Sequence, residues 1–224
     1  MSQLQYLHIR KGYVLEEKDI SRAVISRLPR YYRYLGDLKN EGVERISSQE
    51  LSRLMHVTAS QIRQDFNNFG GFGQQGYGYN TNYLYQEIGK ILGLDEIHYM
   101  ILIGAGNLGQ AIIKYMHFKK RGFYFKGAFD IDPSLHGTMV DTVEIYPMEQ
   151  IGSFVKEHGI DMAVLTVPKA AAKETAAKLY DTGIKAIWNF AHVDLEVPPH
   201  IQVENVHLYD SIMKLSYNLH KSGR

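Results

Sequence analysis

The second half of the chain alternates between short apolar runs and amphipathic stretches. Runs rich in Val, Ile, Leu and Phe predict strands at 99–103, 123–130, 162–167 and 185–190. Between these runs, apolar residues at helical spacing predict helices at 107–118, 148–158 and 170–181. Alternating strands and helices with nearly continuous apolar strands are typical of a parallel sheet covered on both faces. We therefore expect an α/β fold of the Rossmann type at residues 99–206.

The first half has a different pattern, in which helices begin at capping residues. Residues 21–40 predict a helix that restarts at Pro29, because proline is favoured in a first turn. Each of two later helices follows a capping box: Ser47-x-x-Glu50 before 48–55, and Thr58-x-x-Gln61 before a helix to about Phe69. Two capped helices separated by a three-residue turn match the spacing of a helix-turn-helix.

The polar face of the second capped helix carries side chains of the kinds that read DNA bases. A helical wheel places Ile62, Phe66 and Phe69 on one stripe that would face a core. The opposite face carries Ser60, Gln64 and Asn67, with Gln61 and Arg63 on its flanks and Asp65 at its edge. We predict that all of these residues except Asp65 contact DNA. Arg can bind guanine through two hydrogen bonds, and Gln or Asn can bind adenine in the same way. The alternative is an ordinary amphipathic helix with a solvated face.

Arginines and a glycine-rich aromatic segment surround this helix. Six arginines could meet phosphates, with Arg30 a predicted DNA contact: Arg22, Arg27, Arg30, Arg33, Arg45 and Arg53. The glycines and aromatic residues of 69–79 predict a β-hairpin wing, in which Gln74, Gln75 and Tyr77 should touch DNA. Because 66–86 carries no charge, this wing should add no ionic affinity. We expect a winged-helix domain at 21–80, preceded by an arm at 1–20.

The glycines after residue 103 form a pattern that suits a dinucleotide. Gly104, Gly106 and Gly109 follow an apolar strand and open a helix, and Asp130 closes the next strand. In this context the glycines allow a tight turn, close approach to a pyrophosphate and close packing of helix on strand. The helix N-terminus favours phosphate. Asp130 can accept bonds from both ribose hydroxyls and favours NAD(H) over NADP(H); alternatively it caps the loop before Asp132.

Ligands of such sheets bind beyond the carboxyl ends of the strands. The loops there contain the predicted cofactor-binding residues: Gly104, Ala105, Gly106, Asn107, Leu108, Gly109, Asp130, Ile131, Thr166, Val167, Pro168, Asn189, Phe190 and Ala191. Thr166 and Asn189 would contact the nicotinamide half, although either could cap a helix instead. A pocket lined by Phe190, Tyr115 and Leu208 would accept the neutral nicotinamide ring of NADH and disfavour the cationic ring of NAD+.

Two further helices complete the predicted organisation. A helix at 81–92 that ends at Gly93 would form a linker at 81–98. Asp210 could N-cap a last helix, at 207–224, with an apolar stripe of Ile212, Leu215 and Leu219. Because the sheet is complete before this helix, the stripe needs a partner. It could pack on its own domain or on a second subunit.

Composition narrows the class of protein. The chain has 224 residues, of which 25 are basic and 24 acidic, and it has no cysteine. Disulfides, Cys-ligated zinc and thiol switches are excluded, so a redox response would need a bound ligand. The histidines lack metal-ligand spacing, no apolar run is long enough to span a bilayer, and no secretory signal is evident. We expect no metal, no membrane segment and a cytoplasmic location.

Taken in order, these motifs resemble those of the redox-sensing transcriptional repressors of the Rex family. The resemblance covers about residues 21–220 and rests on segments 25–28, 31–35, 47–51, 58–65, 69–73, 104–109, 129–130, 165–168, 188–191 and 203–206. It implies a homodimer with an N-terminal winged helix, a C-terminal Rossmann domain and a last helix exchanged between subunits. It also implies binding to operator DNA when NADH is scarce and release when NADH binds. Dimer symmetry then predicts a palindromic operator.

The resemblance further implies a ligand-dependent switch network that contains Arg33 and Tyr115. His207 stands where the family carries an aspartate of that network, which weakens the case for an ionic switch. Gln64 stands where many relatives carry a lysine, so we expect a hydrogen-bonded contact there. An NAD-dependent dehydrogenase is the main alternative, but residues 81–224 leave no room for a substrate domain and show no catalytic residues. A CoA-binding module is the other alternative, and Asp130 argues against it.

Overall fold

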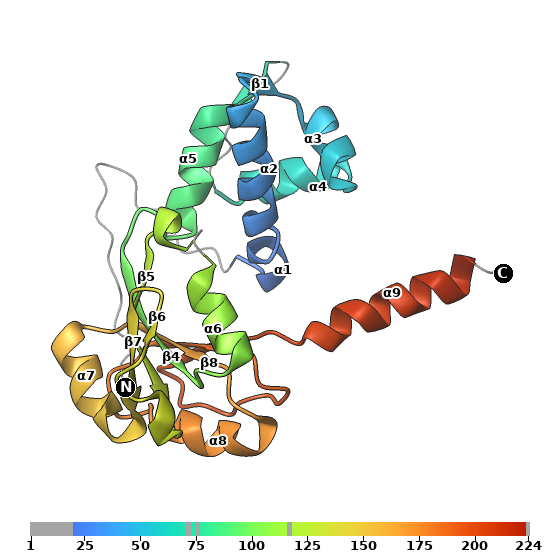
Figure 1. The fold of residues 1–224 in the computed structure, drawn as a ribbon. Coiled ribbons are helices and arrows are strands. Elements are labelled where there is room, and N and C mark those ends of the chain that lie inside the picture. Colours follow the sequence, from blue (N-terminus) through green and yellow to red (C-terminus); the bar gives the residue numbers. More distant parts are fainter. Residues whose placement is uncertain (1–19, 70–72, 75–76, 116–117, 223–224) are drawn as a thin grey trace. The chain divides into compact units, whose positions relative to one another are not determined.

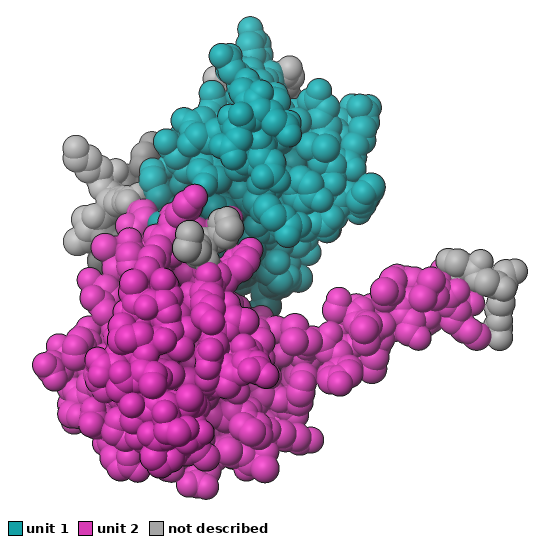
Figure 2. Space-filling view, in the orientation of Figure 1, with its two compact units in different colours: residues 1–94 teal, residues 95–224 magenta. Residues whose placement is uncertain are grey.

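The computed structural model describes residues 20–69, 73–74, 77–115 and 118–222 (Figure 1). The chain forms two compact units, residues 1–94 and residues 95–224, which Figure 2 shows in separate colours. The expected arm at 1–20 lies almost wholly outside the described residues. No described helix has the length and apolar character needed to cross a membrane.

The first helices of unit 1 begin where capping residues predict. α1 (Arg22–Ile25) follows Ser21, whose hydroxyl accepts a bond from the N–H of Val24. α2 (Leu28–Asn40) has Pro29 in its first turn. The helix expected at 21–40 is therefore interrupted after Ile25 and restarts as predicted.

The two helices of the helix-turn-helix follow. α3 (Ser48–Met55) opens with the complete capping box of Ser47 and Glu50. α4 (Ala59–Asn67) opens at Thr58, whose hydroxyl accepts a bond from the N–H of Gln61. The second predicted box is only half present, because the side chain of Gln61 donates to Asp65 instead of returning to Thr58. α4 also ends before Phe69, its expected end.

A small antiparallel sheet completes the winged helix. Its strand order is β1-β3-β2, with β1 (Arg45–Ile46), β2 (Gly73–Gln74) and β3 (Gly78–Asn80). β2 and β3 pair directly and form the predicted wing hairpin. The core of this unit contains buried side chains of α2, α3 and α4, among them Leu35, Leu51, Ile62 and Phe66. The predicted winged helix-turn-helix is confirmed.

α5 (Thr81–Ile91) was expected within a linker, but it packs inside unit 1. Its Leu84 and Ile88 are fully buried in the same core. Its Tyr85 stacks on Tyr32 of α2, with the ring centroids 4.3 Å apart. α5 is therefore a structural part of unit 1.

Unit 2 contains a seven-stranded sheet with the order β10-β9-β8-β4-β5-β7-β6. The predicted strands are present as β4 (His98–Ile103), β5 (Phe123–Asp130), β8 (Met162–Leu165) and β9 (Ala186–Asn189). Three strands that the sequence analysis did not predict extend the sheet at its edges: β6 (Met139–Val140), β7 (Val143–Pro147) and β10 (Gln202–Asn205). Every pairing is parallel except that of β6 with β7. The Rossmann-like parallel sheet is confirmed.

Helices cover both faces of this sheet. α7 (Ile151–His158) and α8 (Lys169–Ala177) pack with Ile101 and Ile103 on one face. α6 (Asn107–Lys114) packs with Met100 and Leu102 on the other. Three short 3-10 turns, η1 (Lys119–Arg121), η2 (Pro133–Leu135) and η3 (Met148–Gln150), lie between these elements. α6 ends before Phe118, its expected end, and η3 replaces the first turn of the helix predicted from 148.

α9 (Leu208–Ser222) leaves the sheet of unit 2 as an extended arm (Figure 1). It begins before Asp210, so this residue lies in the first turn and is not the N-cap. The predicted stripe of Ile212, Leu215 and Leu219 is exposed to 61%, 57% and 67%. Packing of this stripe on its own domain is therefore absent from the described chain.

Candidate functional site

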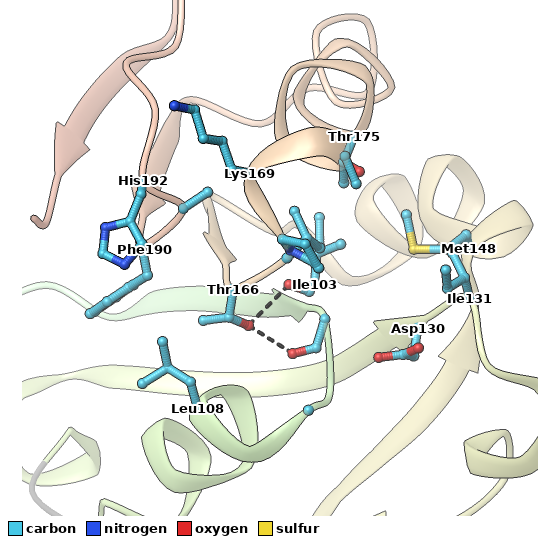
Figure 3. Close-up of a pocket in the computed structure, with 16 residues that line it drawn as sticks. Ile103, Leu108, Asp130, Ile131, Met148, Thr166, Lys169, Thr175, Phe190 and His192 are labelled. Atoms are coloured by element: carbon cyan, nitrogen blue, oxygen red, sulfur yellow. Dashed lines mark hydrogen bonds between the residues drawn. The ribbon is translucent and has the colours of Figure 1, made fainter.

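Unit 2 carries a cavity of about 530 Å³ at the carboxyl ends of its strands (Figure 3). This volume lies within the range of small-molecule and cofactor pockets. Sixteen residues line it: Ile103, Gly104, Gly106, Leu108, Asp130, Ile131, Met148, Thr166, Val167, Pro168, Lys169, Ala171, Thr175, Phe190, Ala191 and His192. The four predicted loops thus converge on one cavity. Among the described residues, no group of His, Asp and Glu could hold a metal ion.

Some predicted cofactor residues do not line the cavity. Ala105, Asn107 and Gly109 belong to the glycine turn but are not part of the lining, and neither are Asn189 and Tyr115. The lining includes six residues that the sequence analysis did not predict: Ile103, Met148, Lys169, Ala171, Thr175 and His192. Of these, Lys169 and His192 each directly follow a predicted residue. A window one residue wider at the ends of β8 and β9 would have included both.

The three glycine positions of the turn differ in whether the fold would tolerate a side chain there. Gly104 has φ +95°, and a Cβ there would lie 3.0 Å from the backbone of Thr166. A Cβ on Gly109 would lie 2.2 Å from the carbonyl oxygen of Gly104. A Cβ on Gly106 would meet no atom within 4 Å. The fold of the chain therefore requires the first and third glycines, but not the second.

Asp130 at the end of β5 organises the same turn. Its Oδ2 accepts a bond of 2.6 Å from the N–H of Ala105, and its Oδ1 accepts one of 2.9 Å from the N–H of Asp132. The loop-capping alternative is therefore present. Each carboxylate oxygen keeps a further lone pair, and Asp130 still lines the cavity, so it can also accept from a ribose hydroxyl.

The two side chains predicted near the nicotinamide, Thr166 and Asn189, form hydrogen bonds to other groups of the protein. The hydroxyl of Thr166 lines the cavity and donates to the carbonyl oxygen of Gly104 at 2.7 Å. Asn189 is fully buried; its Nδ2 donates to the carbonyl oxygen of Val193 and to Oδ1 of Asn205, and its Oδ1 accepts from the N–H of Ala191. The structure thus places Asn189 behind the cavity, where it ties β9 to β10.

Replacing Asn189 with Ala should destabilise the protein rather than abolish nucleotide binding. The change leaves the buried N–H of Ala191 without its partner, which typically costs about 1–3 kcal/mol. Thermal denaturation should therefore show a lower Tm, while nucleotide titration of the folded variant should show nearly unchanged affinity. A large loss of affinity at unchanged Tm would restore Asn189 as a direct ligand.

The predicted switch residues have separate local contacts. The Arg33 guanidinium in unit 1 lies 5.5 Å from the ring centroid of Tyr34. In unit 2, Tyr115 is exposed and its ring lies 5.6 Å from that of Phe118, and Nε2 of His207 lies 3.1 Å from Oδ1 of Asp194. Neither Tyr115 nor Leu208 lines the cavity, so of the three residues predicted to surround the nicotinamide ring only Phe190 does.

On α4, the predicted DNA-reading face is exposed at all positions but one. Ser60, Arg63, Gln64 and Asn67 are exposed. Nη1 of Arg63 donates to the hydroxyl of Ser48 at 3.0 Å, so this guanidinium reaches from α4 to the start of α3. Gln61 is the exception, since it is half-buried and bound to Asp65.

The arginines near α4 divide by their contacts. Arg27 forms an ion pair with the buried Asp65 through Nε and Nη2, so these two nitrogens are not available to a phosphate. Nη2 of Arg30 donates to the carbonyl oxygen of Met55 at 2.5 Å. Arg45 on β1 is exposed; its Nη1 donates to the carbonyl oxygen of Tyr77 at 3.1 Å, and its guanidinium lies 5.4 Å from that ring. The residues of the wing hairpin thus carry no charge of their own, but Arg45 of the neighbouring strand places a positive charge beside Tyr77.

The structure describes only some of the other residues of the wing that are predicted to contact DNA. Tyr77 is 71% exposed next to β3. Gln74 lies in β2, and Gln75 falls outside the described residues.

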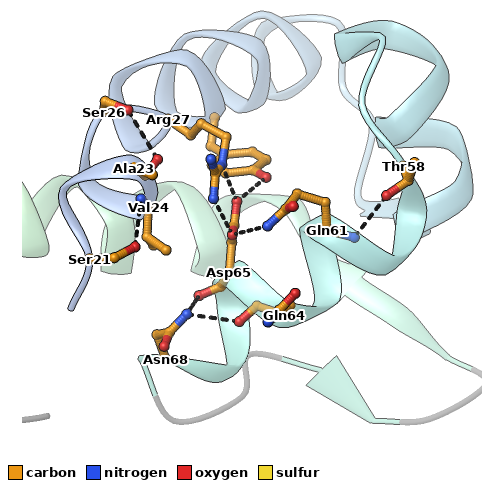
Figure 4. Close-up of polar contacts among 11 residues, drawn as sticks. Ser21, Ala23, Val24, Ser26, Arg27, Thr58, Gln61, Gln64, Asp65 and Asn68 are labelled. Atoms are coloured by element: carbon orange, nitrogen blue, oxygen red, sulfur yellow. Dashed lines mark hydrogen bonds and ion pairs between the residues drawn. The ribbon is translucent and has the colours of Figure 1, made fainter. Parts of the chain in front are cut away.

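Asp65 is fully buried within unit 1 instead of lying at the edge of the polar face, and it contacts Arg27, Tyr31 and Gln61 (Figure 4). Nε and Nη2 of Arg27 each donate to it at 2.7 Å, as does the hydroxyl of Tyr31, and Nε2 of Gln61 donates at 2.8 Å. Burial raises the pKa of Asp65, but these hydrogen bonds outweigh it and hold the pKa below its ordinary value of 3.8. Burial and the neighbouring Asp65 raise the pKa of Tyr31.

The lowered pKa predicts how Asp65 contributes to stability at acidic pH. The charged form is favoured in the folded state, so its contribution is complete above the ordinary value of 3.8 and is lost as the pH falls through the folded pKa. We compare the free energy of unfolding of the wild type with that of Asp65→Asn. The difference should narrow as the pH falls below 3.8. A constant difference across that range would contradict this assignment.

Both halves of the chain match family models. Residues 19–67 match the model described as putative DNA-binding protein N-terminus. Residues 95–193 match the model described as CoA binding domain. The first match covers α1 to α4 and ends before the wing, and the second covers the Rossmann-like sheet from β4 to β9.

Relatives match nearly the whole chain. A protein of Thermoanaerobacter sp. (strain X514) named redox-sensing transcriptional repressor Rex is 55% identical over 202 residues, which is 90% of each chain. A protein of the same name from Clostridioides difficile (strain 630) is 53% identical over 211 residues, covering 94% of this chain and all of the relative.

Solved structures agree with this assignment. The crystal structure of RSP with β-NAD+ and operator DNA has a TM-score of 0.87 and 54% identity, covering 92% of this chain and 95% of RSP. RSP with β-NADH has a TM-score of 0.86 and 51% identity, covering 92% and 97%. RSP is described as a Rex-family repressor. The chain therefore belongs to the Rex family of redox-sensing transcriptional repressors.

Proposed function

We propose that this protein is a redox-sensing transcriptional repressor that binds operator DNA and is released when NADH binds. The observation that carries the proposal is its 54% identity, over 92% of the chain, to a repressor solved with operator DNA and NAD+. The two sites described above support it, since one chain holds both an exposed recognition helix and a glycine-turn cavity. As a regulator of bacterial operators, it would act in the cytoplasm without catalysing a reaction.

The cavity of unit 2 is the proposed NAD(H) site. The pyrophosphate would lie at Gly104, Gly106 and the N-terminus of α6, where free N–H groups face it. The ribose hydroxyls would bond to Asp130, and the nicotinamide would lie near Phe190. Six other predicted contacts line the cavity and belong to this site: Leu108, Ile131, Thr166, Val167, Pro168 and Ala191. We also retain as proposed contacts four residues that do not line the cavity: Ala105, Asn107, Gly109 and Tyr115.

The proposed DNA contacts lie on α4 and the wing. Arg63, Gln64, Ser60 and Asn67 would meet base edges or phosphates from exposed positions. The remaining candidates are Arg30, Gln61, Gln74, Gln75 and Tyr77. Arg45 joins them, because its guanidinium places a charge beside Tyr77 that can meet a phosphate.

A homodimer would let two winged helices read a palindrome. The exposed stripe on α9 supports a dimer in which this helix packs against the partner subunit. The resemblance to the Rex family implies the same exchange of the last helix between subunits. Closed twofold symmetry then requires two equivalent DNA half-sites. We keep Arg33, Tyr115 and His207 as a proposed switch network across this assembly.

A ligand moves an equilibrium only through its different affinity for the two states. NADH and NAD+ differ mainly in the charge and planarity of one ring. Phe190, Leu108 and Ala191 give the cavity an apolar wall, which favours the neutral ring. Lys169 also lines the cavity and adds a positive charge that disfavours a cationic ring.

The proposal is tested by a gel shift with a palindromic operator, at fixed salt, with and without NADH. The complex should form without nucleotide or with NAD+ and dissociate with NADH. Equal release by the two nucleotides would overturn redox sensing.

Coenzyme A is the second candidate ligand, since residues 95–193 match a model of that description. Asp130 would repel the ribose phosphate of CoA, so CoA should compete poorly with bound NADH. Displacement of NADH by equimolar CoA would favour this alternative. Substrate-dependent NADH oxidation would favour an enzyme instead, whereas binding without turnover supports the regulator.

A further inference from the structure

One base-reading candidate on α4 is held in place from inside the protein. Nε2 of Gln61 lies 2.8 Å from Oδ1 of Asp65 (Figure 4). An ionised carboxylate accepts hydrogen bonds but donates none. The end of Gln61 that faces Asp65 must therefore be its nitrogen, and its Oε1 is the end left available to another partner.

Asp65 is a rigid anchor for this contact. Both of its oxygens are bound by the Arg27 guanidinium, and Oδ2 also accepts from the hydroxyl of Tyr31. Charge-assisted bonds of this two-point kind fix geometry as well as adding energy. The side chain of Asp65 is fully buried, so water does not compete for it. Gln61 is thus attached to a carboxylate that cannot turn.

We propose that Asp65 is a positioning residue that fixes the amide of Gln61, so that Gln61 presents its oxygen to the DNA and selects a base carrying an amino group. In the major groove, these bases are adenine, through N6, and cytosine, through N4. Gln61 lies in the first turn of α4, the part of a recognition helix that meets base edges. This inference rests on the proposed binding of operator DNA.

Gln64, three residues further along α4, provides a matched comparison. Its side chain is exposed, and Asp65 bonds to Gln61 and not to it. A glutamine that can turn offers either end of its amide to the DNA. The same residue type therefore occurs on one helix with a fixed amide and with an exposed one.

The test selects binding sites from a library of randomised palindromic DNA with the full-length protein. Gln61→Met should lose the preference for an amino-bearing base at one position of each half-site, by at least about 5-fold, within the range of one lost base contact. Gln64→Met should change a different position. Asp65→Asn should weaken the preference at the Gln61 position, because an asparagine can bond either end of that amide. The double variant should match Gln61→Met.

Base preference distinguishes this role from a merely structural one, which would lower affinity for all sequences alike. An unchanged profile in Gln61→Met, or a wild-type preference in folded Asp65→Asn, would overturn the inference. If Asp65→Asn does not fold, side-chain amide exchange in the wild type decides instead: NMR should show slower exchange for Gln61 than for Gln64, and equal rates would overturn the contact. Failure of the wild type to select any DNA would instead overturn the proposed function.

Discussion

Replacing Gly106 with Ala is expected to weaken NADH binding about 100-fold, or roughly 2.7 kcal/mol, without lowering the Tm. The backbone of Gly106 has φ −72°, which any residue adopts, and a Cβ there would meet no protein atom within 4 Å. Nothing in the protein itself therefore requires glycine. The bound pyrophosphate does, because the second glycine of this pattern lets the backbone approach it closely. Fluorescence titration with NADH measures the effect.

Two other glycines give the controls. A Cβ on Gly152 in α7 would also meet no atom within 4 Å, and this residue does not line the cavity, so Gly152→Ala should bind NADH normally. Gly109→Ala should lower the Tm instead, because its Cβ would collide with a backbone oxygen 2.2 Å away. Wild-type NADH affinity in Gly106→Ala would show that the nucleotide does not lie against this turn.

Arg63→Ala should reduce the affinity for operator DNA by roughly 10- to 100-fold and leave NADH affinity unchanged. Arg63 is exposed on α4, and its bond to Ser48 holds the guanidinium between the two helices of the helix-turn-helix. Its removal deletes a two-point base contact or a phosphate contact. Fluorescence anisotropy with labelled operator at fixed salt measures the loss.

Lys178→Ala is the matched control for lost charge. It removes one positive charge from an exposed position on unit 2, next to Glu174. Its operator affinity should stay within about twofold of the wild type, because long-range charge effects are screened at physiological salt. Similar losses in the two variants would indicate a general electrostatic effect and not a contact of α4.

Local sequence signals predicted most of the fold. Ser47 and Glu50 set the start of α3, and the apolar runs gave four strands of the large sheet within two residues. The strands towards the two edges of the sheet were harder, because β7 and β10 have only five and four residues. So short an alternation of apolar and polar residues is a weak strand signal unless the neighbouring strand is known.

The site was predictable where chemistry follows from local sequence and less so where it depends on distant contacts. The loops around Gly104, Asp130 and Phe190 met as expected, since parallel strands end at one edge of the sheet. The burial of Asp65 was not predictable, because it depends on Arg27, 38 residues away in the chain. The pairing of Arg45 with the wing depends in the same way on a strand that pairs with β3.

The central claim is that binding of NADH and binding of operator DNA oppose each other in this protein. We would measure the affinity for NADH with and without saturating operator, and the affinity for operator with and without saturating NADH, in one buffer. For each ligand, we divide its affinity in the absence of the other ligand by its affinity in the presence of that ligand. Thermodynamic linkage requires these two ratios to be equal. The account predicts equal ratios well above one, whereas an NADH affinity unaffected by operator DNA would contradict it.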